Sequence, residues 1–405
     1  MYPHRFLKRL TWLALVFHLS GVVHASRAHT PRQHAVRQGI DYMLDERYAR
    51  SHAIFDSLIS VEPERPEGYL GKALSYWNES MLLADGERFV DSVDHLTGRA
   101  IKLSERALKN DNNDAEMVFL LGKAYGLRAG LALIHGSPLD GVLHGLKCRD
   151  FLEETLRLNP DLADAHFGLG LAEYVAARQP RFLRVVSRLL SLPDGDRKGG
   201  LERLERVARE GVYTQRHAVS SRAYIALYYE KDYEDARRRF TDLHLRYPHS
   251  LDYRIRYLDA LFGLTIQGRK DHRQALIDSA RSIRFLAEER NWNLNRWSRT
   301  KLDFIEGFGL YLAGDADAAK ERLEVYTAEA VKKSWLLGPA HLILGKLADL
   351  RNDRKRAVRH YRRVRKYENV WGVHEEADAY IGQPFSGEEP VRRPPDTVRR
   401  YPEKP

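Results

Sequence analysis

Residues 151–174 read FLEETLRLNPDLADAHFGLGLAEY and contain the pattern on which the organisation of the whole chain rests. Leu152, Thr155 and Leu156 fall on one face of a helix that ends at Asn159-Pro160, because proline cannot continue a helix. A second helix begins its buried face six residues later, with His166, Leu169, Gly170 and Tyr174. A helix that stops at proline and is followed at a fixed distance by a glycine-bearing helix indicates a junction between two stacked helical hairpins.

The same arrangement recurs along the chain. Counted from Arg32, the first copy places five residues at positions 8, 11, 20, 24 and 32 of a repeat, namely Gly39, Tyr42, Ser51, Phe55 and Pro63. Later copies contain Gly307, Ala319 and Leu323, and then Gly345, Ala357 and Tyr361. The copy that begins near His217 matches in its first helix only with a slip of one residue, and residues 251–298 form a degenerate copy.

This pattern resembles the tetratricopeptide repeat (TPR) family, over residues 32–381. The resemblance implies an all-α solenoid of about eight helical hairpins whose inner surface holds a protein partner. It also favours a non-enzymatic scaffold or adaptor, for which no cofactor or metal is expected.

The second, third and fourth repeats carry insertions of 15, 14 and 18 residues at the same place, between their two helices. Each insertion contains turn-forming residues, at Asp85-Gly86, Gly136-Ser137-Pro138 and Pro193-Asp194-Gly195. We therefore expect three lengthened hairpins, or arms, on one side of the solenoid. The third arm, around residues 178–190, is basic and amphipathic, which fits either membrane contact or packing against a neighbouring arm.

The two ends of the chain have different compositions from the repeats. Arg5, Lys8 and Arg9 precede an apolar run from Leu10 to Val23, which is typical of a secretory signal cut after Ala25, so residues 1–25 are interpreted as a signal peptide. A retained membrane anchor and a transit peptide are the alternatives. Residues 382–405 are rich in proline and arginine and predict a disordered basic tail. We expect export to the periplasm or another part of the cell envelope.

The positions that line the groove of such a solenoid are largely apolar here. In the TPR family these are positions 2, 5, 9, 12 and 13 of the first helix of each repeat. Here they include Leu70, Leu74, Phe119, Lys123, Phe167, Leu171, Tyr174 and Tyr311. Their character favours a hydrophobic or amphipathic partner segment over a charged chain terminus. The alternative is that these side chains are packed internally. The lysine and asparagine set with which some TPR proteins clamp a carboxylate is not reproduced.

The chain is basic, with a formal charge of +10 that falls to +7 once the three signal-region cations are removed. Residues 351–366 predict a helix with a seam of Ala357, Tyr361 and Val364, and with basic residues outside it: Arg354, Lys355, Arg359, Arg362, Arg363 and Lys366. This face could contact an anionic membrane or a cell-surface polymer, or it could be a solvated cap of the last repeat. Nucleic acid is not an expected partner of an exported protein.

One pair of residues could suggest catalysis. His144 and Cys148 lie four positions apart on one helix face, as a thiol nucleophile and its base would, but Cys148 also fills the small-residue position 20 of its repeat. Cys148 is the only cysteine, so no disulfide forms within the chain. The Gly-Lys pairs at residues 71, 122 and 345 lack the spacing and the strand of a phosphate-binding loop, and His166 and His341 occupy packing positions.

Overall fold

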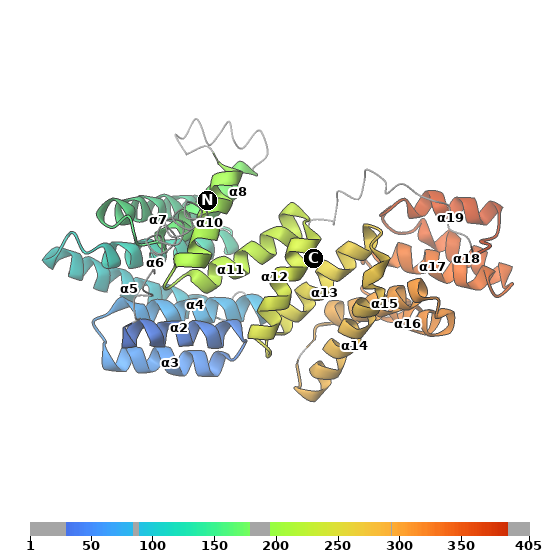
Figure 1. The fold of residues 1–405 in the computed structure, drawn as a ribbon, viewed down its shortest axis with the longest axis horizontal. Helices are drawn as coiled ribbons and strands as arrows, with labels where there is room; N and C mark the ends of the chain where they lie inside the picture. Colours follow the sequence, from blue (N-terminus) through green and yellow to red (C-terminus); the bar gives the residue numbers. More distant parts are fainter. Residues whose placement is uncertain (1–29, 84–88, 179–194, 293, 388–405) are drawn as a thin grey trace, which may run out of the picture.

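The computed structural model describes residues 30–83, 89–178, 195–292 and 294–387, and in this part of the chain it contains 17 α-helices and no strand (Figure 1). The helices form eight antiparallel hairpins followed by a single helix, α19 (Val373–Gly382). The first four hairpins are α2 (Pro31–Leu44) with α3 (Tyr48–Val61), α4 (Pro66–Leu83) with α5 (Val90–Asn110), α6 (Ala115–Ile134) with α7 (Pro138–Leu158), and α8 (Ala165–Ala177) with α10 (Arg197–Glu210). The last four are α11 (Gln215–Tyr224) with α12 (Tyr233–Arg246), α13 (Leu251–Ile266) with α14 (Arg273–Glu289), α15 (Arg296–Ala313) with α16 (Ala316–Glu329), and α17 (Leu337–Asp349) with α18 (Arg354–Val364).

Close helix contact at glycine holds the hairpins together. A Cβ atom on Gly39 of α2 would lie 2.5 Å from the Phe55 ring of α3, and one on Gly71 of α4 would lie 2.0 Å from the same ring. The Ser51 hydroxyl, at repeat position 20, donates a 2.9 Å hydrogen bond to the carbonyl of Gly39 at position 8. Phe55 therefore joins its own hairpin to the next one through two positions that accept no side chain.

The same contact recurs near the C-terminal end of the solenoid. A Cβ atom on Gly345 would lie 2.3 Å from the Tyr361 ring, and one on Gly307 would lie 2.8 Å from Leu323. These are the position 8 and position 24 residues of their repeats, as the sequence pattern predicts. The predicted all-α, TPR-like solenoid of about eight hairpins is therefore confirmed.

The first two insertions lengthen existing helices. In the α4–α5 and α6–α7 hairpins they are absorbed mainly into helices of 18 to 21 residues. By length and composition α6 could cross a membrane, but residues 117–122 in its first half are buried in the core. The third insertion lies largely at residues 179–194, outside the described residues.

The one-residue slip predicted near His217 has a structural cause. Residues Ile225–Glu230 continue α11 as a π-helix, which accommodates one more residue than the same length of α-helix. Lys231 then adopts a left-handed conformation, with φ 55°, and the amide of Asp232 donates to the carbonyl of Ala226. The extra residue is absorbed before α12 begins, so the following helix keeps its register.

The first superhelical turn closes on itself. The turn between α2 and α3 contacts the segment between α12 and α13, about 204 positions later in the chain. The Asp45 carboxylate accepts from the backbone N–H of His249 at 2.8 Å, and the other carboxylate oxygen lies 3.0 Å from His249 Nδ1. Asp41 accepts from Tyr247 Oη at 2.8 Å and also contacts Arg216. Polar side chains thus join the two ends of the turn.

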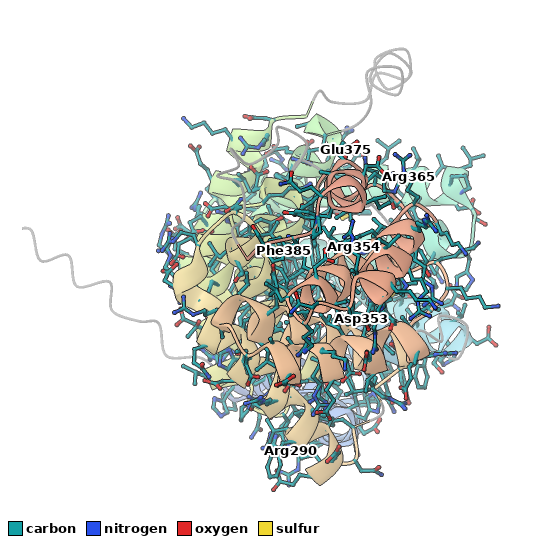
Figure 2. The ribbon with its side chains drawn as sticks, turned by 90° about the vertical axis from the view of Figure 1, so that its right-hand side faces the viewer. Arg290, Asp353, Arg354, Arg365, Glu375 and Phe385 are labelled. Carbon is teal, nitrogen blue, oxygen red and sulfur yellow. The ribbon has the colours of Figure 1, made fainter. Side chains whose placement is uncertain are left out.

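The C-terminal tail begins with a packed segment. The Phe385 side chain is buried, its ring lies 5.3 Å from that of Tyr380, and its backbone N–H donates to Asp349 at 3.0 Å. Figure 2 shows this end of the molecule, with Phe385 beside Arg354. The predicted disordered segment therefore does not begin directly after Gly382. Residues 388–405 and the predicted signal peptide lie outside the described residues.

We expect Gly71→Ala to destabilise the protein by about 1–3 kcal/mol, because its Cβ overlaps the Phe55 ring. Gly145→Ala is the matched control, since a Cβ at this position of α7 meets nothing within 4 Å. The control should be neutral or stabilising by up to about 1 kcal/mol, the difference in helix propensity. Urea unfolding monitored by circular dichroism distinguishes the two; an equal loss in both variants would contradict the proposed role of the contact.

Candidate partner-binding groove

The inner faces of the hairpins enclose a groove of about 1040 Å³. It is lined from the first helices of seven successive hairpins, α2, α4, α6, α8, α11, α13 and α15, by part of α7 and by Tyr48 at the start of α3. Five of the eight predicted groove residues line it, namely Leu74, Phe119, Lys123, Phe167 and Leu171. The structure thus brings these five side chains together in one groove.

The other three predicted groove residues lie elsewhere. Leu70 and Tyr174 are each only 1% exposed and pack inside the solenoid. The hydroxyl of Tyr174 donates to Glu230 at 2.6 Å, away from the groove lining. Tyr311 belongs to the C-terminal part of the solenoid, where its ring lies 5.9 Å from Lys346 Nζ. For Leu70 and Tyr174, the internal-packing alternative applies.

One part of the groove is apolar. In addition to the predicted residues it contains Met43, Leu44, Trp77, Met81, Leu127, Leu133 and Val175. Several of these side chains are substantially exposed: 36% for Leu171, 54% for Val175, 55% for Met81 and 57% for Leu133. All four line the groove and are called its apolar rim below, and an exposed apolar surface of this kind is uncommon in the absence of a partner.

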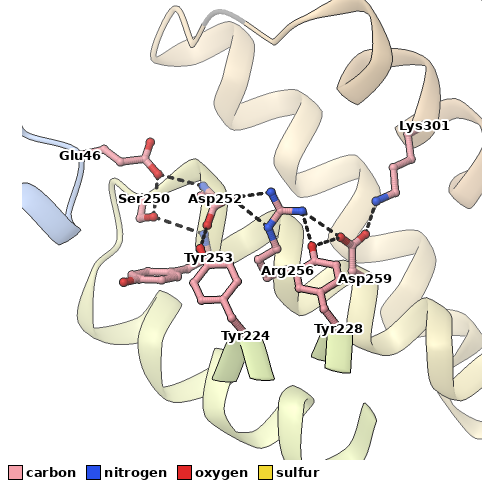
Figure 3. A network of polar contacts seen from close by, with 9 residues as sticks. All are labelled: Glu46, Tyr224, Tyr228, Ser250, Asp252, Tyr253, Arg256, Asp259 and Lys301. Carbon is pink, nitrogen blue, oxygen red and sulfur yellow. Dashed lines mark hydrogen bonds and ion pairs between the residues drawn. The ribbon is translucent and has the colours of Figure 1, made fainter. Parts of the chain in front are cut away.

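Another part of the groove lining is polar and carries a charge network that the sequence analysis missed (Figure 3). Arg256 lies between two carboxylates on its own helix, 2.7 Å from Asp252 and 3.2 Å from Asp259. Lys301 of α15 also contacts Asp259, and Tyr224 donates to Asp252. Two cations and two carboxylates thus balance one another. The spacing of 252, 256 and 259 on one face of a helix could have revealed this network, but it lies in the repeat that matches the pattern poorly.

Glu46 links this network to the closure of the superhelical turn. Its carboxylate accepts from Ser250 Oγ at 2.7 Å and from the backbone N–H of Asp252 at 2.9 Å (Figure 3). Burial raises the pKa of Glu46 to about 7, and the nearby Asp252 carboxylate acts in the same direction. The closing contact therefore contains a group that titrates near neutral pH.

Lys123 is the cation on the groove floor that lacks a direct counter-ion. No acceptor lies within hydrogen-bond or ion-pair distance of its ammonium group in the described part of the chain. Burial lowers the pKa of Lys123 to about 8. His217, whose ring packs against Phe167, also lines the groove, and neither of its ring nitrogens has a hydrogen-bond partner among the described residues. Burial, together with the charges of Lys123 and Arg216, lowers the pKa of His217 to about 3.

The candidate catalytic pair does not form an activated nucleophile. Burial raises the pKa of the Cys148 thiol to about 12, so the thiol is protonated at neutral pH. The His144 ring lies against that of Tyr125, at 5.8 Å, and its Nδ1 has no hydrogen-bond partner in the described segments. Within the same segments no three metal-ligating side chains come together.

The two histidines predicted at packing positions of their repeats, His166 and His341, are buried. His166 lies between Arg203 and Arg206, with its ring nitrogens 2.6 Å and 2.9 Å from their guanidinium groups. His341 faces His360 of α18, with 3.1 Å between their Nδ1 atoms. Burial lowers the pKa of His166 and of His360 to about 4, and that of His341 to about 3.

The predicted basic helix is α18, and its seam residues Ala357, Tyr361 and Val364 are fully buried, as expected. Both terminal nitrogens of the Arg354 guanidinium group have partners. Nη1 lies 3.1 Å from the Asp349 carboxylate, and Nη2 donates to the carbonyls of Tyr380 and Ile381. The other five predicted cations are exposed and form no ion pair with the described residues: Lys355, Arg359, Arg362, Arg363 and Lys366. These five side chains are called the α18 basic face below.

Among known proteins, only solved structures show similarity to this chain. No family model and no curated protein matches the sequence. Similar structures include the TPR protein TTC0263 of Thermus thermophilus, with 19% identity, a TM-score of 0.34, and coverage of 57% of this chain and 98% of that one. They also include PilF of Pseudomonas aeruginosa, with 14% identity, a TM-score of 0.38, and coverage of 64% and 97%. Human IFIT1, solved as a dimer with m7Gppp-AAAA, has 13% identity, a TM-score of 0.35, and coverage of 84% and 70%.

We expect the stability of the wild-type protein to fall relative to that of Glu46→Gln as the pH rises from about 5 to about 8. A carboxyl whose pKa is higher in the folded state than in the unfolded state favours folding at low pH, and this contribution is lost as the pH rises through the folded-state pKa of about 7. The relative loss should amount to about 2–3 kcal/mol.

The free energy of unfolding, measured in urea across this pH range, tests the prediction. Glu153→Gln, on the exposed surface of α7, controls for the loss of one carboxylate. Parallel pH profiles for the wild type and Glu46→Gln would show that Glu46 does not titrate in the closing contact.

Proposed function

We propose that the protein is a non-enzymatic scaffold that holds an amphipathic or hydrophobic segment of a protein partner in its groove. The observation that carries the proposal is the apolar, partly exposed rim on a groove formed by seven hairpins. An elongated apolar surface with polar groups at one end is suited to an amphipathic helix, which buries its apolar face against the groove and leaves its polar face in water.

The partners we propose are proteins of the cell envelope or of secretion. This part of the proposal is supported by the signal-like composition of residues 1–25. The mechanism is reversible docking, in which the fold is already formed and the partner segment becomes ordered on binding.

A photo-reactive amino acid at Leu171 should crosslink to a protein partner in the native cell. The position is 36% exposed and lies in the groove lining. The same amino acid at Leu245, which is 69% exposed and lies outside the lining, is the matched control. The yield of the crosslinked product should fall when Phe167 is changed to alanine, because this change removes a side chain from the groove lining. Equal crosslinking from both positions would contradict docking in the groove.

A second candidate function is docking to an anionic membrane or cell-surface polymer through the α18 basic face. The observation that favours it is a contrast between two arginine-rich helices. On α12, Arg237, Arg238 and Arg239 pair with acidic residues, among them Glu234 and Asp235 of the same helix. The cations of the α18 basic face have no such partners among the described residues. Such a surface attracts anions through its summed field.

Reversing three charges, as in Arg359→Glu/Arg362→Glu/Arg363→Glu, should abolish flotation with vesicles that contain anionic phospholipid. The control is Arg106→Glu/Arg157→Glu/Arg238→Glu, which changes the net charge equally at exposed arginines that already have acidic partners. Wild-type flotation should also weaken as salt is added, since salt screens exposed charges. Flotation that responds equally to both triple variants would rule out a specific role for α18.

A further inference from the structure

The groove has one feature that restricts the chemistry of its ligand, namely Lys123, the cation of its described lining that has no direct counter-ion. The two nearby acidic side chains have partners other than Lys123, although Oε2 of Glu67 is buried without a hydrogen bond. The Asp164 carboxylate accepts four hydrogen bonds of 2.6–2.8 Å, from the backbone N–H groups of Val212, Tyr213 and Thr214 and from the Thr214 hydroxyl. Glu67 Oε1 is bonded to Arg65 and lies 3.3 Å from Arg32. Neither carboxylate reaches Lys123, so its partly buried side chain lines the groove without a direct counter-ion.

The neighbours of Lys123 on its own helix are apolar. Phe119 and Leu127 lie four positions before and after it, so all three side chains fall on the same face of α6, and all three line the groove. Phe167 of α8 adds an aromatic ring to the same lining. A ligand lying along α6 therefore meets an apolar side chain, then a cation, then a second apolar side chain.

His217 contributes no charge to the groove lining. Its imidazole is neutral at physiological pH, because burial lowers its pKa to about 3. Both ring nitrogens are buried and have no hydrogen-bond partner in the described part of the protein, so they are not available to a ligand in the groove.

We propose that the segment held in the groove is an otherwise apolar helix with one aspartate or glutamate on its buried face, and that the carboxylate of this residue pairs with Lys123. The proposal rests on the proposed function and specifies the partner of the same groove. A helix packed along α6 would carry an apolar residue about one turn before and one turn after the acid, matching Phe119 and Leu127. Lys123 is thus a specificity-determining residue, and the apolar rim supplies the area of contact.

A carboxylate fits this site better than a phosphoryl group does. Among the described lining residues, Lys123 is the one cation without a direct ion-pair partner, since Arg256 and Lys301 pair with Asp252 and Asp259, so the lining offers a ligand a single positive group. The Asp164 carboxylate is held by neutral donors, and its negative charge disfavours a ligand that carries more than one negative charge. A carboxylate carries one negative charge, whereas a phosphoryl group carries close to two at neutral pH. The second charge would remain uncompensated among apolar side chains.

The experiment is a selection from a displayed library of amphipathic helical peptides against the purified full chain, followed by calorimetry. Peptides selected by the wild type should contain Asp or Glu at one position of the apolar face. The best glutamate peptide should bind about ten- to a hundredfold more tightly than its glutamine twin, as is usual for a charge-assisted hydrogen bond. Lys123→Met should abolish this preference, whereas Lys102→Met, at an exposed position of α5, should keep it.

The pH dependence provides a second readout that a purely structural role of Lys123 would not change. The groups that interact electrostatically with Lys123 are Glu67 of α4, Asp164 before α8 and His217 of α11. Affinity for the glutamate peptide should fall as the pH rises above about 8, where the lysine loses its proton. Affinity for the glutamine twin should stay level, and Lys123→Met should bind both peptides without this fall.

The outcomes separate this proposal from the proposed function. Selected peptides that lack an acid, or an acid preference that survives Lys123→Met in a folded variant, would overturn the role of Lys123 while the groove remains a peptide site. If no selected peptide loses binding on Leu171→Glu, which places a charge in the apolar lining, the groove itself is not the binding site and both proposals fail. If no peptide is selected and laurate binds in a manner that depends on Lys123, the ligand of the groove is a lipid-like carboxylate and not a protein segment.

Discussion

The architecture depends on the absence of side chains at a few positions where helices touch. Phe55 packs against Gly39 within its own hairpin and against Gly71 of the next, and any Cβ at either position would overlap the ring. Such contacts set the distance between successive hairpins and therefore the curvature of the solenoid. The curvature in turn brings Asp41, Asp45 and Glu46 to the residues before α13. The groove exists because the rotations between successive hairpins together produce a closed superhelical turn.

Much of this fold could be predicted from the sequence, because each repeat places its packing residues at fixed intervals. Gly39, Phe55, Gly345 and Tyr361 could be assigned to contacts from their positions alone, since such contacts are local. The one-residue slip near residue 217 was visible as an irregularity. Its cause was not, because a π-helical turn is a matter of backbone geometry that no residue type in that stretch specifies.

The groove was less predictable, because its walls come from residues far apart in the chain. The repeat register identified Phe119, Phe167 and Leu171, which lie on the first helices of the third and fourth repeats. It also selected Leu70 and Tyr174, which lie on the first helices of the second and fourth repeats but turn into the interior. The network around Arg256 could not be inferred, because its link to Glu46 depends on the closure of the superhelical turn, which no local pattern encodes.

The closed turn leaves the groove lining exposed during part of the synthesis of the chain. The apolar lining at Phe119 and Leu171 belongs to the third and fourth hairpins, whereas the contacts that close the turn require residues near Ser250 and Asp252. Since synthesis proceeds from the N-terminus, the lining is present in the growing chain well before its last wall. For that interval the same surface that is suited to a partner segment is open to any apolar chain nearby, and this exposure ends only when the closing contacts form.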